Sequence, residues 1–189
     1  MANRDGPYGF RPHKHLTGGE IRTSRYKIAT GLAENIRTGD AVEMTGTGRN
    51  IALSAAGNVD TVGVFAGVQY VNAQGEQKFA KMWTTGMAGT EIEALVWDDP
   101  NILFKAQCDT LAEGDVGALA DLAAGTGSDA TGNSGAYVDV GSGTATTGKS
   151  IKIMELLPRV DNAYGAYAEC VCLFVEQGHS RVISGTGGV

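Results

Sequence analysis

Glycine recurs so often along this chain that long helices are excluded. It makes up 28 of the 189 residues, about twice its usual share of roughly 7%. Each glycine inside a helix costs about 1 kcal/mol relative to alanine, and the glycines run from Gly6 to Gly188 with few long gaps. There is no Gly-X-Y period, so a collagen-like triple helix is also excluded. The hydrophobic content of 42% is sufficient for a packed core.

Short segments rich in β-branched and aromatic residues alternate with turn residues at intervals of about 8 to 12 residues, which is typical of β-sandwiches and β-barrels. The connections at residues 45–48 and 72–75 have hairpin length and contain glycine, which indicates antiparallel neighbours. The sequence therefore predicts an all-β fold, an antiparallel β-barrel or a jelly-roll-like sandwich. The predicted strands are residues 21–29, 41–45, 50–54, 61–71, 77–84, 92–96, 102–108, 116–122, 136–140, 150–156 and 167–176.

Composition divides the chain into three parts. Residues 1–19 are predicted to form an extended N-terminal arm, residues 20–183 a single β-rich domain, and residues 184–189 a glycine-rich tail. Within the domain, residues 123–149 contain seven glycines and only three charged residues. That composition predicts a flexible loop.

A Gly-Asp step precedes an apolar strand twice, in residues 37–42 and in residues 112–117. In each case the glycine can adopt the turn conformation, and the aspartate can cap the backbone amides beyond it. The pair is compatible with an internal duplication and also with independent use of a common turn.

The net charge of −6 is unevenly distributed. Residues 1–27 carry a net charge of +4, and residues 28–189 carry −10. An acidic body argues against binding to nucleic acid, because phosphate contacts require a coherent positive surface. No apolar run approaches the roughly 18 residues of a membrane span, and the first residues lack the apolar core of a secretory signal. We expect a protein assembled in the cytoplasm that binds neither nucleic acid nor membrane.

The basic N-terminal segment has the features of a docking arm. Pro7 and Pro12 favour extended geometry, and apolar and basic side chains recur between the bends. We expect this arm to bind an acidic surface of a neighbouring protein. The alternative is that its aromatic side chains fold back on the protein's own core. The candidate docking residues are Arg4, Tyr8, Phe10, Arg11, Lys14 and Leu16.

Residues 143–150 match the phosphate-loop pattern G-x-x-x-x-G-K-S. That loop requires a helix that begins at the Lys-Ser pair and directs its dipole at the phosphate. Here residues 151–153 alternate like a strand, and Pro158 limits any helix to about two turns. The sequence therefore predicts a structural turn without a nucleotide.

The remaining candidates for chemistry are few. Cys108, Cys170 and Cys172 have no disulfide-framework spacing and are predicted to be reduced core thiols, the last two on one face of a strand. Residues 98–101 could form a calcium loop, but two carboxylates before a proline are more typical of a solvated turn. No nucleophile elbow or zinc-protease motif is present in the sequence. We expect no catalytic site, no bound metal and no cofactor.

The opening MANRDGPYGFRP, followed by HLTGG at residues 15–19, resembles the start of small structural proteins of tailed bacteriophages. VGVFAGVQYV at residues 62–71, followed by Trp83 and Gly86, is similar to the same group. Over roughly its first half the chain thus resembles a capsid decoration (cement) protein. The resemblance implies a β-rich subunit, commonly a homotrimer, on the outer surface of the phage head. There it would bind the major capsid protein and stabilise contacts between capsid subunits.

Other functions remain open from the sequence. The chain could be another virion component of similar composition, such as a tail, neck or fibre-base protein. From other classes, a small β-barrel hydrolase is possible, and so is a carbohydrate-binding module that uses Trp83 or Trp97 as a stacking platform.

Overall fold

The computed structural model describes residues 3–29, 31–45, 48–55, 61–145 and 149–175. Strands account for 49% of the described residues. No α-helix occurs in these five segments, whose only helical element is one short 3-10 turn, η1 (Glu113–Asp115). The predicted all-β, mainly antiparallel fold is confirmed. No described segment forms a helix long and apolar enough to cross a membrane.

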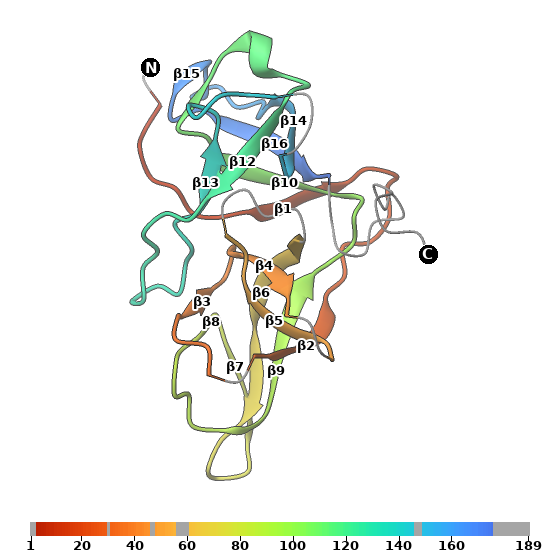
Figure 1. Cartoon of the computed structure of the whole chain (residues 1–189), viewed down its shortest axis with the longest axis vertical. Coiled ribbons are helices and arrows are strands. Elements are labelled where there is room, and N and C mark those ends of the chain that lie inside the picture. Colours follow the sequence, from red (N-terminus) through yellow and green to blue (C-terminus); the bar gives the residue numbers. More distant parts are fainter. Residues whose placement is uncertain (1–2, 30, 46–47, 56–60, 146–148, 176–189) are drawn as a thin grey trace.

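Five strands of the first half close into a barrel, which we call the N-terminal barrel (Figure 1). Their order is β4-β5-β2-β9-β6, and β6 pairs with β4 to close the ring. The pairing of β2 with β5 is parallel, and the other pairings are antiparallel. β7 extends the sheet beyond β6. The strands are β2 (Ser24–Ile28), β4 (Ala41–Met44), β5 (Asn50–Leu53), β6 (Thr61–Val71), β7 (Gln77–Ala80) and β9 (Thr90–Trp97).

The second half builds the C-terminal barrel, which lies above the first in Figure 1. Its strand order is β10-β16-β14-β12-β13. A parallel bridge between Cys108 and Val138 brings β13 back to the end of β10, and the Asp109 amide donates to the Val138 carbonyl at 3.2 Å. The strands are β10 (Ile102–Gln107), β12 (Leu119–Ala123), β13 (Tyr137–Asp139), β14 (Ile151–Leu156) and β16 (Glu169–Phe174).

The two barrels correspond strand by strand. β2, β4, β5, β6 and β9 match β10, β12, β13, β14 and β16 in order and in pairing partners. Phe65 pairs with Val96, and Ile153 pairs with Cys172, and in both barrels a β-bulge follows at once. The internal duplication that the sequence left open is therefore present in the topology. Each barrel also has a pair of two-residue strands, β3 (Ile36–Arg37) with β8 (Met82–Trp83), and β11 (Thr110–Leu111) with β15 (Gly165–Ala166).

The repeated Gly-Asp step belongs to this duplication, but its glycines are not equivalent in the way the sequence indicated. Gly39 (φ +98°) corresponds to Gly117 (φ +89°) and not to Gly114. Each of these two glycines donates its amide to the facing strand at the same place, to the Phe65 carbonyl at 2.9 Å and to the Ile153 carbonyl at 2.8 Å. Counted from the amide that the aspartate caps, the second loop contains three more residues before the equivalent glycine. For this reason the matching Gly-Asp pairs in the sequence do not contain the structurally equivalent glycines.

The aspartates of the two steps act alike, although not as predicted. The carboxylate of Asp40 accepts a hydrogen bond from the Arg37 amide at 2.7 Å, and that of Asp115 accepts one from the Ala112 amide at 2.8 Å. Each aspartate thus caps the amide three residues before it. The expectation that it caps the amides beyond it is wrong, because the turns at residues 37–40 and 112–115 bring each aspartate back to the amide at the start of its own turn.

The cores of the two barrels are filled differently. By register, Tyr26 and Ile28 in the N-terminal barrel correspond to the smaller Ala106 and Cys108 in the C-terminal barrel. The C-terminal core instead takes in Phe10, which comes from outside the repeat and is fully buried. The same cluster includes residues of β4 and β6 from the N-terminal barrel, so the two cores are joined.

The N-terminal segment is extended, as predicted, but it is not a free arm. β1 (Arg11–His15) pairs antiparallel with β10. Just before it, the Gly9 amide donates to the Ala136 carbonyl at 3.1 Å and the Phe10 amide to the Gly39 carbonyl at 2.9 Å. The expected boundary between an arm and a domain at residue 19 is therefore wrong, because the segment supplies an edge strand and a core side chain to the C-terminal barrel.

The glycine-rich segment is not an open loop in its described part. It contains β13, and before β13 it contacts the N-terminal barrel. The Thr38 amide donates to the Gly132 carbonyl at 3.1 Å, the Ser134 amide donates to the Thr38 carbonyl at 3.0 Å, and Arg37 pairs with Asp129 at 2.6 Å. These contacts connect the two barrels. The predicted tail at residues 184–189 lies outside the described residues.

Candidate interaction surfaces

Two of the predicted docking residues are held by the protein itself. Phe10 is fully buried and meets Phe174 edge to face, with ring centroids 5.0 Å apart. The Tyr8 hydroxyl donates to Glu169 Oε2 at 2.9 Å. Burial, with the charge of Glu169, raises the pKa of Tyr8 above its usual range. The prediction that Phe10 anchors a neighbour is wrong, because the side chain has no exposed surface.

The other candidates are not brought together into one site. Arg11 is half-buried and donates to Asn133 Oδ1 at 2.9 Å, and burial lowers the pKa of Arg11 from its usual value. Lys14 pairs with Glu155 on the surface. Arg4 and Leu16 are exposed. The segment therefore offers scattered polar contacts and one exposed leucine.

Four of the six large apolar side chains that are exposed among the described residues lie instead at the two ends of the molecule. Phe79, which is 57% exposed, lies on β7 at the hairpin end, the lower end in Figure 1. At the opposite end, Val160 and Tyr164 precede β15, and Tyr167 follows it; their exposed fractions are 103%, 43% and 40%. We call these residues around β15 the loop end. Sequence reasoning missed both ends, although an aromatic residue in a turn-rich stretch after Pro158 was a usable signal.

Tyr167 at the loop end has an unusual backbone conformation, with φ of +59°. Left-handed conformations are uncommon for residues other than glycine and asparagine. A pocket of about 180 Å³ beside it is lined by Arg4 and Arg159 among others, and Arg159 pairs with Asp161 and Glu169 at 2.7 and 2.9 Å. Exposed tyrosines beside arginines are typical of the anchor residues of protein interfaces.

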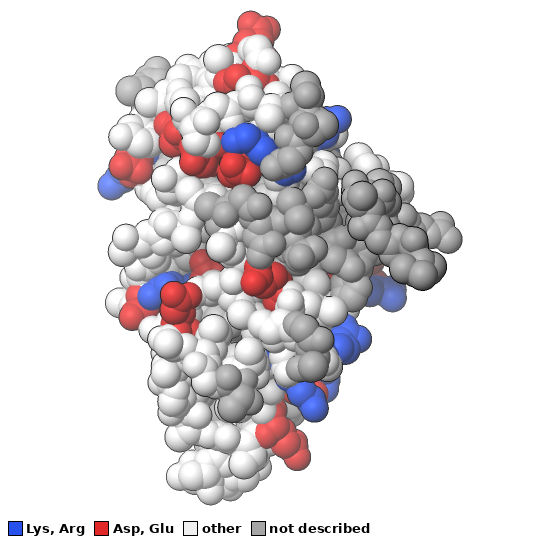
Figure 2. All heavy atoms as spheres, viewed as in Figure 1, with Lys and Arg blue, Asp and Glu red and all other residues white. Residues whose placement is uncertain are grey.

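Basic side chains gather along one side of the N-terminal barrel. Figure 2 shows them along the edge of the lower half of the molecule, on the side where β2 and β5 lie in Figure 1. We call this the basic flank. It consists of the exposed residues Arg22, Arg25, Lys27 and Arg49.

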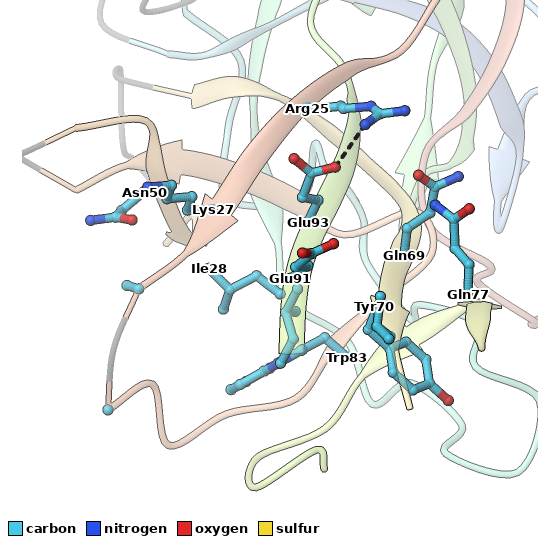
Figure 3. Close-up of a pocket in the computed structure, with 14 residues that line it drawn as sticks. Arg25, Lys27, Ile28, Asn50, Gln69, Tyr70, Gln77, Trp83, Glu91 and Glu93 are labelled. Atoms are coloured by element: carbon cyan, nitrogen blue, oxygen red, sulfur yellow. Dashed lines mark hydrogen bonds and ion pairs between the residues drawn. The ribbon is translucent and has the colours of Figure 1, made fainter. Parts of the chain in front are cut away.

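A groove of about 670 Å³ is lined by residues of β2, β9, β6 and β7 (Figure 3). Glu91 and Glu93 point into it from β9, and Gln69 and Gln77 lie across from them. Glu93 is paired with Arg25 at 2.9 Å. No histidine or cysteine is among the described residues that line the groove.

Neither tryptophan forms an exposed stacking platform. Trp83 is 8% exposed and belongs to the core of the N-terminal barrel. Trp97 is half-buried and packs against the core of the C-terminal barrel. Neither indole is therefore the fully exposed platform that the carbohydrate-binding alternative assumed.

The segment that matches the phosphate loop leads into a strand, as predicted. β14 follows Ser150 directly, so no helix begins at the Lys-Ser pair. Lys149 Nζ is bound to Asp121 Oδ2 at 2.9 Å, and Ser150 is fully buried. A lysine engaged by a carboxylate and a buried serine cannot hold phosphate and magnesium in the usual way. Residues 146–148 of the motif lie outside the described residues.

The three cysteines are buried and unbridged. Cys170 and Cys172 lie in one core cluster, and Val171 between them lies in another, so the prediction that they share a face is confirmed. A hydrogen bond with Cys170, together with burial, raises the pKa of Cys108 and of Cys172. Both effects favour the neutral thiol of these two residues.

The carboxylates at residues 98–101 serve the connection between the barrels. Asp98 accepts hydrogen bonds from the hydroxyls of Ser24 and Tyr26 at 2.9 and 2.7 Å. Asp99 accepts from the Asn101 amide at 2.8 Å, and its other oxygen lies 3.1 Å from His15 Nε2. Nowhere in the described chain do three or more histidine, cysteine or acidic side chains form a group that could hold a metal ion.

Comparisons with family models, with curated proteins and with solved structures give no match for this chain.

Proposed function

We propose that this protein is a structural virion protein that binds the outside of the phage head and stabilises contacts between major capsid subunits. The proposal starts from the resemblance of residues 1–19 and 62–71 to capsid decoration proteins. It includes self-association as a homotrimer and assembly in the host cytoplasm, with no enzymatic activity.

One observation supports this function above the others. The exposed aromatic side chains lie at opposite ends of a body made of two barrels, at Phe79 and around β15. The barrels are connected by the backbone hydrogen bond from Phe10 to Gly39, by the contacts of the glycine-rich segment and by a shared core. A body with apolar anchors at both ends can contact two neighbouring subunits at once. Two weak contacts on one body bind far more tightly together than separately.

The test uses head shells of the major capsid protein encoded in the same genome, prepared without this protein. We expect the purified protein to bind the shells and to raise their temperature of disruption. Tyr164→Ser should weaken binding by about ten- to a hundredfold, since burying one aromatic side chain contributes about 1.5–3 kcal/mol. Phe79→Ser should have a similar effect. Met44→Ser, which removes an exposed apolar side chain between the two ends, is the matched control.

The outcomes separate the candidate functions. Binding to shells with no gain in shell stability would contradict the stabilising role. Binding to purified tails or necks and not to shells would favour another virion component. No binding to any particle would contradict a virion role altogether.

A further inference from the structure

The duplication shows where one barrel accepts an added strand. β1 lies on the free edge of β10, where Arg11 pairs with Lys105, Pro12 with Phe104 and, after a bulge, Lys14 with Leu103. This pairing is antiparallel. The same edge ends at the bridge from β10 to β13. An extended segment from outside the repeat thus completes the side of the C-terminal barrel.

The equivalent edge of the N-terminal barrel is the first part of β2 and the residues before it. By register, Ser24 and Arg25 correspond to Phe104 and Lys105. Thr23 then corresponds to Leu103, which pairs with Lys14 of β1. The Lys27 amide donates to the Arg49 carbonyl at 2.8 Å on the β5 side. Because backbone groups alternate along a strand, those of Thr23 and Arg25 point to that same side.

This edge, which we call the acceptor edge (residues 22–25), has no strand beside it among the described residues. β5 pairs with β2 only at Lys27 and Ile28, and β9 occupies the opposite side. Residues 22, 23 and 25 are exposed. An exposed row of unpaired backbone donors and acceptors is a template for the addition of another strand.

The charge around the acceptor edge selects the kind of segment that fits. The edge includes Arg22 and Arg25 of the basic flank. Arg22 pairs with Glu20, and Arg25 with Glu93, but in both pairs the side chains are 41% or more exposed. Exposed pairs of this kind exchange partners at little cost. The complementary segment is therefore acidic. The chain's own residues 176–189 carry one acidic and one basic residue besides a histidine and lack that complement.

We propose that the acceptor edge binds an acidic, extended segment of the capsid shell protein as an added antiparallel strand. This inference rests on the proposed function, because the shell supplies the segment. The acceptor edge then pairs with the partner's segment as the edge of β10 pairs with β1. This pairing fixes the orientation of the decoration protein on the shell.

The test removes backbone donors and charge separately. Thr23→Pro removes one amide of the edge, and Arg25→Glu reverses one charge. Each should weaken binding to the shells about tenfold, Thr23→Pro through the loss of one or two hydrogen bonds and Arg25→Glu through repulsion of an acidic segment. Lys152→Glu, which reverses an exposed charge on β14 away from the acceptor edge and from both ends, is the matched control. Thermal melting checks that all three variants are folded. Amide exchange at Thr23 and Arg25 should be fast in the free protein and slowed on shells.

The results that overturn the inference are distinct from those that overturn the function. If both variants bind shells as tightly as the wild type, the acceptor edge is not used, although the proposed function stands. If the wild type itself does not bind, both fail. If deletion of residues 177–189 speeds exchange at Thr23 and Arg25 in the free protein, the edge is occupied by the chain's own tail, and the inference is also overturned.

Discussion

The N-terminal barrel fills its centre with its own Tyr26, whereas the C-terminal barrel has Ala106 at the matching position and takes Phe10 into its core from the N-terminal segment. The strand order, the register and the bulge are the same in both. A barrel topology can therefore be kept while the source of its core volume changes, provided that the total volume is restored.

The difference also changes how the two barrels depend on the rest of the chain. Tyr26 is held within the N-terminal barrel, where burial and the hydrogen bond to Asp98 raise the pKa of Tyr26 to about 12. The C-terminal barrel is incomplete without residues 3–15, which supply both Phe10 and β1. Damage to the N-terminal segment should therefore affect the later half of the sequence more than the earlier half.

The largest expected effect follows from deleting residues 2–15. The deletion removes the Phe10 side chain and the strand that pairs with β10. Their combined contribution to the free energy of unfolding is a large part of the usual total of about 5–15 kcal/mol. We expect the C-terminal barrel to unfold, with loss of its dispersed amide signals in NMR spectra. Thermal unfolding at the wild-type temperature would contradict the dependence of this barrel on the segment.

Phe10→Ala should destabilise the protein by about 3–5 kcal/mol, because it leaves a cavity in a closely packed core. Leu16→Ala changes a residue that is 52% exposed and should alter the free energy of unfolding by less than about 0.5 kcal/mol. Denaturant titration of both variants measures the contrast. Equal effects would restore the idea that the segment is a free arm.

The two equivalent glycines give a finer comparison. Gly39→Ala and Gly117→Ala both place a Cβ at positive φ, which costs about 1–2 kcal/mol. A Cβ at Gly39 would also approach Gly9 Cα and the Tyr8 carbonyl oxygen at 3.2 Å each, whereas nothing lies within 4 Å at Gly117. Gly39→Ala should therefore be the more destabilising of the two. The reverse order, measured by denaturant titration, would contradict the packing of the segment on this loop.

The smallest expected effect is a dependence on pH. Burial raises the pKa of Asp40, whereas the matching position in the C-terminal barrel is Ala118. A raised pKa means that the stabilising contribution is complete below the unfolded-state pKa and is lost as the pH rises through the folded-state pKa. Relative to the wild type, Asp40→Asn should gain stability as the pH rises through that range.

Asp99→Asn is the control with the opposite sign. The hydrogen bond from the Asn101 amide lowers the pKa of Asp99 despite partial burial. The contribution of Asp99 is therefore present at neutral pH and is lost as the pH falls through its folded-state pKa. Unfolding curves of both variants from acid to neutral pH measure the two trends, and parallel trends would contradict the assignment.

The sequence predicted the strands that bury a continuous apolar face. β6 spans the predicted residues 61–71, and β10 and β14 differ from their predictions by one residue. The predicted strand at residues 77–84 divides into β7 and β8, because the Lys81 carbonyl between them accepts a hydrogen bond from the Thr38 amide. Such a break depends on a distant partner and leaves no local signal.

Two other features were beyond the reach of local patterns. β1 contains Pro12 and charged residues, so it shows no apolar alternation; its pairing with β10 holds it in place. The duplication is hidden because equivalent core positions differ in size, as Tyr26 and Ala106 do, and because the Gly39 and Gly117 loops differ in length. Similar backbone geometry can persist when these side chains no longer match.

Residue-resolved hydrogen exchange on Phe10→Ala tests most directly whether the N-terminal segment completes one barrel of a duplicated pair. We expect exchange to speed up throughout β14 and β16, while the amides of Phe65 and Val96 in the N-terminal barrel keep most of their protection. A uniform loss of protection in both barrels, or a loss confined to the N-terminal barrel, would contradict this account.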